Sequence, residues 1–167
     1  TLSYFQVDNP LVRPTDPLFV GLHCEANAEM SSKVVQKRSH DEKVGVLGLV
    51  NGRMGCIEYS DMPTDMLQST DPQGALRFSA GNIAVHAVST DFIREITEGG
   101  LRLPWHVASK RISCVTPEGQ TTEVDGLKFE TFVFDALGLA KRSVTLEVDR
   151  AAEFSPVKNR LGTDSPD

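Results

Sequence analysis

The sequence has few cysteines, and they form no pattern typical of a metal site or a disulfide framework. Cys24, Cys56 and Cys114 are widely spaced, odd in number and include no CxxC pair. Reduced thiols are typical of a cytosolic protein, so we expect a cytoplasmic location. The first residues do not pattern as a signal peptide, and no apolar run approaches the length that spans a bilayer. These absences predict no membrane partner.

Basic runs are also missing. Seventeen Lys and Arg stand against twenty-three Asp and Glu, which leaves a net charge of −6, and the cations are not clustered. This balance argues against a nucleic-acid partner. A small phosphate-bearing ligand stays compatible with it, because such a ligand needs only a few local cations. Neither GxxxxGK[ST] nor GxGxxG occurs, so the common phosphate-binding loops are absent from these residues.

What is present is an ordinary globular composition. The chain has 167 residues, of which 40% are apolar and 24% charged, enough to bury one domain-sized core. Hydrophobic periodicity and turn signals alternate between strand and helix, which predicts an α/β fold with a mixed sheet flanked by helices. The predicted strands are 2–7, 33–37, 44–50, 53–59, 111–115, 121–124 and 144–148, and the predicted helices are 17–29, 63–69, 90–96 and 129–137.

The stretch 78–86, FSAGNIAVH, combines a small-residue pair with polar side chains. We read Ala80-Gly81 as a turn that delivers Asn82 into an apolar run ending at His86. Glycine allows a close approach to the main chain, and the Asn amide offers donors and an acceptor suited to a sugar hydroxyl or an acetamido group. On local evidence alone, a strand-entry turn with a hydrogen-bonded core His86 is the favoured explanation.

Four further charged residues stand at element ends. Glu58 lies among residues that pattern as buried, where a carboxylate is costly unless paired, although a cross-strand ion pair would explain it too. Asp8 follows the first strand, where an Asx turn before a proline is the alternative. With Lys128 and Lys158, these residues suit an anionic sugar ligand and a metal, because Lys binds phosphate and Asp can hold Mg²⁺.

Six motifs now carry a resemblance in the same order along nearly the whole chain: QVDN at 6–9, IEYSD at 57–61, GNI at 81–83, GLKFE at 126–130, FVFD at 132–135 and EFSPVKN at 153–159. Together they resemble the UDP-sugar pyrophosphorylases, and most of all the UDP-N-acetylglucosamine pyrophosphorylases. The resemblance implies a nucleotide-diphospho-sugar transferase fold, GT-A-like and Rossmann-related. It also implies formation of a UDP-sugar and pyrophosphate from UTP and a sugar 1-phosphate, with Mg²⁺.

The resemblance also implies roles for individual residues. Asp8 would lie at the nucleotide and metal centre. The residues that would bind the sugar are Glu58, Gly81, Asn82, Phe132 and Phe134. The residues that would act in catalysis by facing the phosphates are Lys128 and Lys158.

The chain departs from the family pattern in places. Asp61 stands where relatives commonly have Glu, Val157 where they commonly have Leu, and Ala84-Val85 replaces a small-polar pair, which bears on the choice of sugar. The family's Gly-rich nucleotide loop is not found here. We therefore expect residues 1–159 to be the C-terminal part of a uridylyltransferase catalytic domain, followed by a polar tail, 160–167. We also expect the chain to be inactive without the missing N-terminal, nucleotide-binding part.

Two alternatives stay open at this point. One is a UDP-glucose or broad UDP-sugar pyrophosphorylase. The other is a non-catalytic domain that binds a sugar nucleotide.

Overall fold

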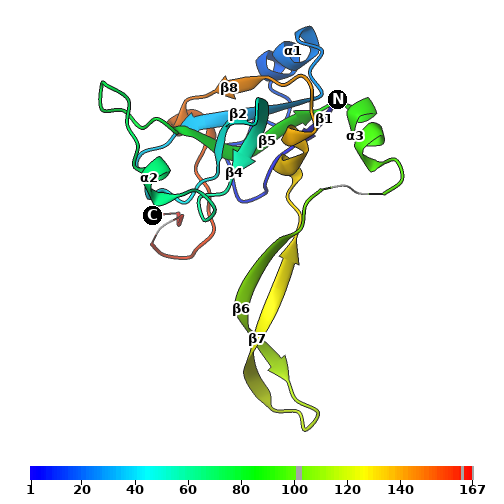
Figure 1. The fold of residues 1–167 in the computed structure, drawn as a ribbon, viewed down its shortest axis with the longest axis vertical. Coiled ribbons are helices and arrows are strands. Elements are labelled where there is room, and N and C mark those ends of the chain that lie inside the picture. Colours follow the sequence, from blue (N-terminus) through cyan, green and yellow to red (C-terminus); the bar gives the residue numbers. More distant parts are fainter. Residues whose placement is uncertain (101–102, 163, 167) are drawn as a thin grey trace.

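The computed structural model describes residues 1–100, 103–162 and 164–166. Its body is a six-stranded sheet with the order β4-β3-β5-β2-β8, and β1 pairs with β5 (Figure 1). The strands are β1 (Leu2–Tyr4), β2 (Met30–Gln36), β3 (Val46–Val50), β4 (Arg53–Ile57), β5 (Ala80–Val88) and β8 (Thr145–Glu147). β2 and β8 run parallel and the other neighbours antiparallel, so the sheet is mixed as predicted.

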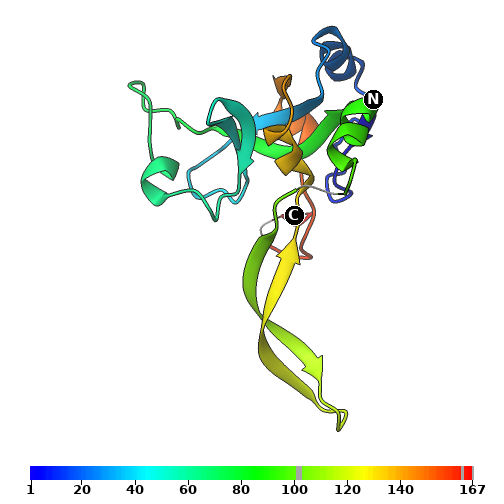
Figure 2. The same ribbon diagram turned by 45° about the vertical axis from the view of Figure 1, so that its right-hand side comes forward.

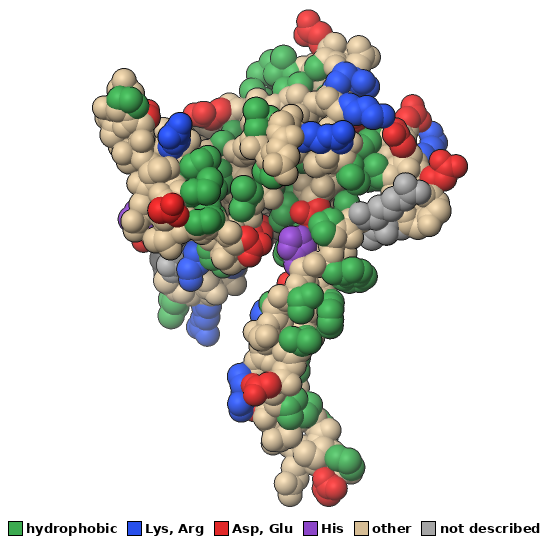
Figure 3. Space-filling model, in the orientation of Figure 1, with side chains coloured by type: hydrophobic (Ala, Val, Ile, Leu, Met, Phe, Trp, Pro, Cys, Tyr) green, Lys and Arg blue, Asp and Glu red, His purple; other side chains and the backbone are tan. Residues whose placement is uncertain are grey.

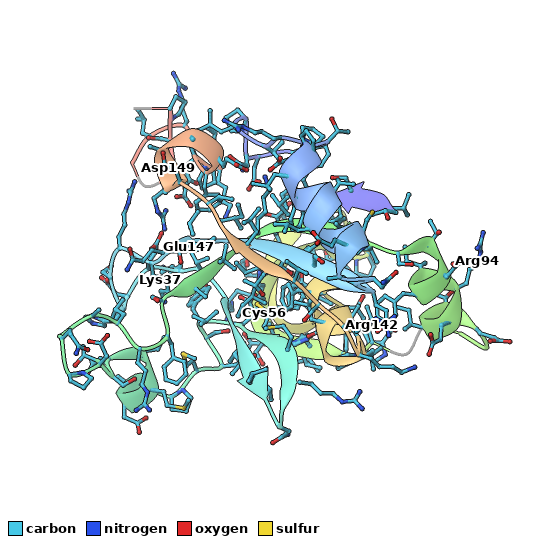
Figure 4. The ribbon with its side chains drawn as sticks, turned by 90° about the horizontal axis from the view of Figure 1, so that it is seen from above. Lys37, Cys56, Arg94, Arg142, Glu147 and Asp149 are labelled. Carbon is cyan, nitrogen blue, oxygen red and sulfur yellow. The ribbon has the colours of Figure 1, made fainter. Side chains whose placement is uncertain are left out.

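Helical segments cover both faces of this sheet. They are α1 (Pro17–Glu25), α2 (Thr64–Leu67), α3 (Thr90–Thr97), the 3₁₀ helix η1 (Val133–Gly138) and α4 (Arg150–Glu153). One core cluster joins the sheet to Phe92 of α3 and Leu137 of η1. A second cluster includes Phe19 of α1, and Phe154 packs against it. Figure 4 shows the body from above, with α1 beside β2 and with Cys56 of β4 near the middle. The predicted α/β class is confirmed.

Local sequence explains where several elements begin and turn. The Asp16 carboxylate accepts a hydrogen bond from the Leu18 N–H (3.0 Å), and Pro17 occupies the first turn, so α1 begins where predicted. Asn51 and Gly52 have φ values of 53° and 79°, as a two-residue turn between β3 and β4 requires. That hairpin is therefore confirmed. No helix in the described part of the chain is both long and apolar enough to cross a bilayer.

A second, two-stranded sheet projects from the body. It consists of β6 (His106–Val115) and β7 (Thr121–Glu130), paired antiparallel along their whole length. The projection is plain in both ribbon views (Figures 1 and 2), and Figure 3 shows hydrophobic side chains along it. The hairpin predicted over 111–124 exists and is longer than expected.

The helix predicted over 129–137 is wrong. β7 continues to Glu130, and the only helical turn in this stretch is the short η1 from Val133. The apolar spacing imitated one buried helix face, but the residues do not share a face: Phe129 is 58% exposed on the hairpin, whereas Leu137 is fully buried in the core.

The turn predicted at Ala80-Gly81 is also wrong, because both residues belong to β5. Gly81 pairs with Val35 of β2 and with Val46 of β3. A Cβ on Gly81 would lie 3.1 Å from the Val35 carbonyl oxygen, so the glycine serves close strand packing. The left-handed residue of this stretch is Ala84, with φ of 54°. Of the predicted polar tail, Thr163 and Asp167 lie outside the described residues.

Candidate functional site

A cavity of about 340 Å³ opens where the end of β1, the residues after β4 and the middle of β5 meet the segments 43–45, 131–134 and 154–158. It brings together five of the predicted site residues, which are Glu58, Asn82, Phe132, Phe134 and Lys158. These residues are up to 100 positions apart in sequence. The fold therefore gathers most of the predicted sugar- and phosphate-binding groups around one space.

Glu58 directly follows β4, and its carboxylate lies beside a glycine. A Cβ on Gly45 would stand 3.1 Å from Glu58 Oε1 and 2.9 Å from Cys56 Sγ, so a side chain here would require both of these side chains to shift. Burial is the main cause that raises the pKa of Glu58, and the nearby Asp61 carboxylate adds to it. The carboxylate is thus held half-buried at the cavity with unused capacity to accept hydrogen bonds.

Asn82 is held by three contacts. Its backbone N–H donates to the Gly45 carbonyl (2.8 Å), and its side-chain Oδ1 accepts from the Ala84 N–H (3.0 Å). Its Nδ2 lies 3.5 Å from Cys56 Sγ. The bond to Ala84 offsets the strain of a left-handed alanine inside a strand, a conformation that costs on the order of 1–3 kcal/mol. One amide hydrogen stays available to a ligand at the cavity.

An aromatic wall forms another side of the cavity. The rings of Phe132 and Phe134 stack with centroids 4.8 Å apart and 15° between their planes. The His106 ring lies 4.7 Å from Phe132 at 54°, and its Nε2 is 2.8 Å from Asp135 Oδ2. Stacked phenylalanines present a flat apolar surface, which suits the apolar face of a sugar ring.

Asp8 and Lys158 lie together near the end of the cavity where we expect phosphate to bind. The Lys158 Nζ is 3.9 Å from Asp8 Oδ2, and the Asp8 carbonyl accepts a hydrogen bond from the Val157 N–H (2.8 Å). Lys158 lines the cavity, whereas Asp8 reaches it through this pair. The Lys158 side chain is 50% exposed, so its charge is accessible to a ligand.

Asn9, which the sequence reasoning passed over, holds this end in place. Its Nδ2 donates to the Glu153 carbonyl (2.8 Å) and its Oδ1 accepts from the Ser155 N–H (3.1 Å). Asn9 is 3% exposed, and the bond to Glu153 is buried while the bond from Ser155 is partly buried. The amide therefore connects the segment of Asp8 to the segment that carries Lys158.

A buried ion cluster supports the same region. Lys33 of β2 is fully buried, and its Nζ lies 2.6 Å from Asp16 Oδ2 and 2.5 Å from Glu153 Oε2. A buried ammonium needs such partners because an unpaired buried charge is very costly. The cluster connects α1, β2 and α4. Its sequence signal is a lysine inside an otherwise apolar and small strand.

Besides Asp8, two predicted residues do not line the cavity. Gly81 precedes Asn82 and is buried between strands. Lys128 lies on β7 of the projecting hairpin, where it is 45% exposed on its side chain and forms an ion pair with Glu130. The geometry thus places Lys158, and not Lys128, beside the cavity, and the phosphate role of Lys128 stays a prediction.

His86 is 1% exposed, and its Nδ1 is 2.9 Å from Ser32 Oγ. Burial lowers the pKa of His86 to about 4, so the ring is neutral at physiological pH. Tyr4 stacks on it at 5.8 Å. These contacts fit a supporting residue in the wall of the cavity, and the buried ring Nε2 has no hydrogen-bond partner among the described residues.

No group of three His, Cys, Asp or Glu side chains within residues 1–100, 103–162 and 164–166 is arranged to hold a metal. Mg²⁺ is often bound by one or two carboxylates together with substrate phosphates. Asp8 fits that mode, because its carboxylate lies beside the cation that we expect to face phosphate.

Comparison with known proteins extends these observations. The family described as UTP–glucose-1-phosphate uridylyltransferase matches residues 4–161. UDP-N-acetylhexosamine pyrophosphorylase-like protein 1 of Xenopus tropicalis is 42% identical over 158 residues, which cover 92% of this chain and 31% of that protein. UDP-N-acetylglucosamine pyrophosphorylase of Saccharomyces cerevisiae is 35% identical over 170 residues, 96% of this chain and 36% of that protein.

The fold matches as well. The crystal structure of the uridine diphosphate N-acetylglucosamine pyrophosphorylase from Trypanosoma brucei, in complex with an inhibitor, superimposes with a TM-score of 0.79 at 30% identity. The match covers 95% of this chain and 32% of that one. The chain spans about a third of the length of the curated relatives it matches. With 158 of its 167 residues matched, this chain belongs to the UTP–glucose-1-phosphate uridylyltransferase family.

Proposed function

We propose that this chain forms the sugar-phosphate side of a uridylyltransferase that makes UDP-N-acetylglucosamine and pyrophosphate from UTP and N-acetylglucosamine 1-phosphate. The observation that carries the proposal is the cavity with Glu58, Asn82 and an aromatic wall together with Lys158. Such a cavity offers hydrogen bonds and an apolar surface to a sugar and a cation to its phosphate. The names of the frog and yeast relatives support an N-acetylated hexosamine as the sugar.

In this proposal the chain works mainly by positioning. Glu58 accepts hydrogen bonds from sugar hydroxyls, and the Asn82 amide contacts the sugar. Gly81 contributes the backbone next to Asn82. A sugar-phosphate oxygen attacks the α-phosphorus of UTP, a new P–O bond forms, and the bond to the bridging oxygen breaks as pyrophosphate leaves. The sugar phosphate is already ionised at neutral pH, so no general base is needed. Orientation and charge neutralisation supply the rate enhancement.

Lys158 neutralises phosphate charge in this scheme. The family resemblance adds Lys128 as a second cation that faces the phosphates. Mg²⁺, held by Asp8 and by substrate phosphates, would offset further charge on the crowded oxygens. Asn9 and the Lys33 cluster hold the segments of Asp8 and Lys158 in fixed positions relative to each other. All three cysteines are free thiols, which supports a cytoplasmic location.

The test uses the intact protein that contains this chain. We expect it, with UTP, Mg²⁺ and N-acetylglucosamine 1-phosphate, to release pyrophosphate and UDP-N-acetylglucosamine, resolved by ion-exchange chromatography. Glucose 1-phosphate and galactosamine-derived phosphates serve as the comparison panel. A clear preference for glucose 1-phosphate would instead identify a UDP-glucose pyrophosphorylase. Binding of UDP-N-acetylglucosamine without turnover would identify a non-catalytic binding domain.

The uridine side of the site is proposed to lie in the remainder of the protein. We therefore expect the 167-residue chain alone to give no turnover under the same conditions. Sustained turnover by the purified chain would contradict this division of the site.

A further inference from the structure

One hydrogen-bonded pair of side chains joins the projecting hairpin to the wall of the cavity. His106 is the first residue of β6, and its Nε2 lies 2.8 Å from Oδ2 of Asp135 in η1. The side chains are 30% and 12% exposed, so the pair is largely shielded from water. It connects the entrance of the hairpin to the segment just after its exit.

The pair contacts the aromatic wall directly. The His106 ring packs against Phe132, and Phe132 stacks on Phe134. The Asp135 N–H also donates to the Phe132 carbonyl (3.1 Å). Both phenylalanines line the cavity, whereas His106 and Asp135 do not. The Asp135 carboxylate thus contacts the His106 imidazole, which contacts Phe132. Phe132 in turn stacks on Phe134, and both rings face the cavity.

Phe132 needs such support because of its place in the backbone. It lies between the end of β7 and the start of η1, outside both hydrogen-bonded elements. Two rotatable side-chain bonds set the direction of its ring, and only neighbouring groups fix them. A partly exposed imidazole would itself be free to rotate, and a hydrogen-bonded carboxylate is the usual device that fixes the orientation of a histidine ring.

We propose that His106 and Asp135 are positioning residues for the sugar end of the cavity: Asp135 orients the His106 ring, and His106 holds Phe132 against Phe134. The inference rests on the proposed function. It assigns the pair to recognition of the sugar 1-phosphate and leaves binding of UTP unaffected. A purely structural pair would instead stabilise the hairpin without discriminating between the two substrates.

The experiment compares steady-state kinetics of the intact enzyme and its His106→Ala variant. We expect the KM for N-acetylglucosamine 1-phosphate to rise about tenfold, because small displacements of a positioning wall are costly. We expect the KM for UTP to stay within about twofold. His106→Gln keeps a side-chain N–H that can bond to Asp135, and it should restore part of the loss.

A matched control lies on the same hairpin. Arg111 pairs with Asp125 at 3.5 Å, with side chains 66% and 89% exposed, far less shielded than His106 and Asp135. Arg111→Ala should leave both KM values unchanged. If His106→Ala fails to fold, Asp135→Asn carries the test, since it keeps the size of the side chain and weakens the bond.

Two results separate failure of this inference from failure of the proposed function. Turnover by the wild type with unchanged or equally raised KM values in His106→Ala and Asp135→Asn would overturn the inference. Without wild-type turnover the proposed function fails, and ring-proton NMR decides the positioning. There, Asp135→Asn should shift the Phe132 and Phe134 resonances, and unshifted resonances would overturn the inference.

Discussion

The sheet body and the projecting hairpin are built on different principles. In the body, polar groups are buried with partners from distant segments: Lys33 is fully buried between two carboxylates, and the buried Asn9 makes two long-range hydrogen bonds. On the hairpin, charges such as Arg111 and Asp125 pair in solvent, and large apolar side chains such as Phe129 are exposed. The comparison teaches that the body preorganises the site, whereas the hairpin contacts the cavity wall through the shielded His106–Asp135 pair at its base.

The largest difference should appear in stability. Lys33→Met leaves Asp16 and Glu153 without their cation, and breaking a buried ion cluster costs about 3–5 kcal/mol of the free energy of unfolding. Arg111→Ala on the hairpin should cost about 0–1 kcal/mol, the range of exposed pairs. Urea denaturation of the intact protein followed by circular dichroism measures both. Equal losses in the free energy of unfolding for the two variants would contradict this difference between the body and the hairpin.

Losses of activity on substitution should also be larger in the body than on the hairpin. Lys158→Ala removes a cation that lines the cavity, as Lys43 also does, and we expect kcat to fall about 10²–10³-fold, as for loss of one charge-stabilising donor. Lys128→Ala removes a cation of the hairpin that pairs with Glu130, and we expect a much smaller change. Pyrophosphate release by the intact enzyme reports both rates.

These variants also test whether the hairpin keeps its position during the reaction. A loss in Lys128→Ala as large as that in Lys158→Ala would mean that Lys128 contributes to phosphate binding as much as Lys158 does. The catalytic cations would then lie on both the body and the hairpin.

Glu58→Gln should affect activity and stability in opposite directions. Activity should fall roughly 10–100-fold, because the amide replaces a carboxylate acceptor for sugar hydroxyls. Burial raises the pKa of Glu58, so the protonated carboxyl favours the folded state below its unfolded pKa, and this contribution is lost as the pH rises through the folded pKa. The variant should therefore be more stable than the wild type at pH 8, and the gain should shrink towards pH 5. A gain that does not depend on pH would contradict this account.

The smallest effect concerns the pH dependence of the body. Burial lowers the pKa of His86 to about 4, so the neutral ring contributes stability above its ordinary pKa of 6.5, and this is lost as the pH falls towards 4. His86→Gln should flatten the fall in stability over that range, measured by urea denaturation at several pH values. His106→Gln, a substitution at a histidine at the base of the hairpin, is the control, and a fall flattened equally there would contradict the assignment.

Elements fixed by local chemistry could be predicted from the sequence. Asn51-Gly52 demands a tight turn, Asp16-Pro17 begins a helix, and both occur. The stretch 129–137 could not be predicted by periodicity, because strand pairing with β6 extends β7 through Phe129. Tertiary pairing there outweighs an apolar spacing that suits a helix equally well.

The site was predictable where a polar residue stood out locally, as Glu58 does among apolar neighbours. Residues whose role depends on distant partners were not. Asn9 bonds to a residue 144 positions away, and Gly45 lies against the Glu58 carboxylate, which a Cβ there would displace. The pairing of His106 with Asp135 likewise depends on the hairpin that separates them.

The central claim is that the cavity in the body binds the sugar-phosphate part of a UDP-sugar. A crystal structure of the intact protein with UDP-N-acetylglucosamine tests it most directly. The account predicts the sugar between Glu58, Asn82 and the Phe132–Phe134 wall, with the diphosphate at Lys158. A bound ligand that leaves this cavity empty, or that places its sugar along the hairpin, would contradict it.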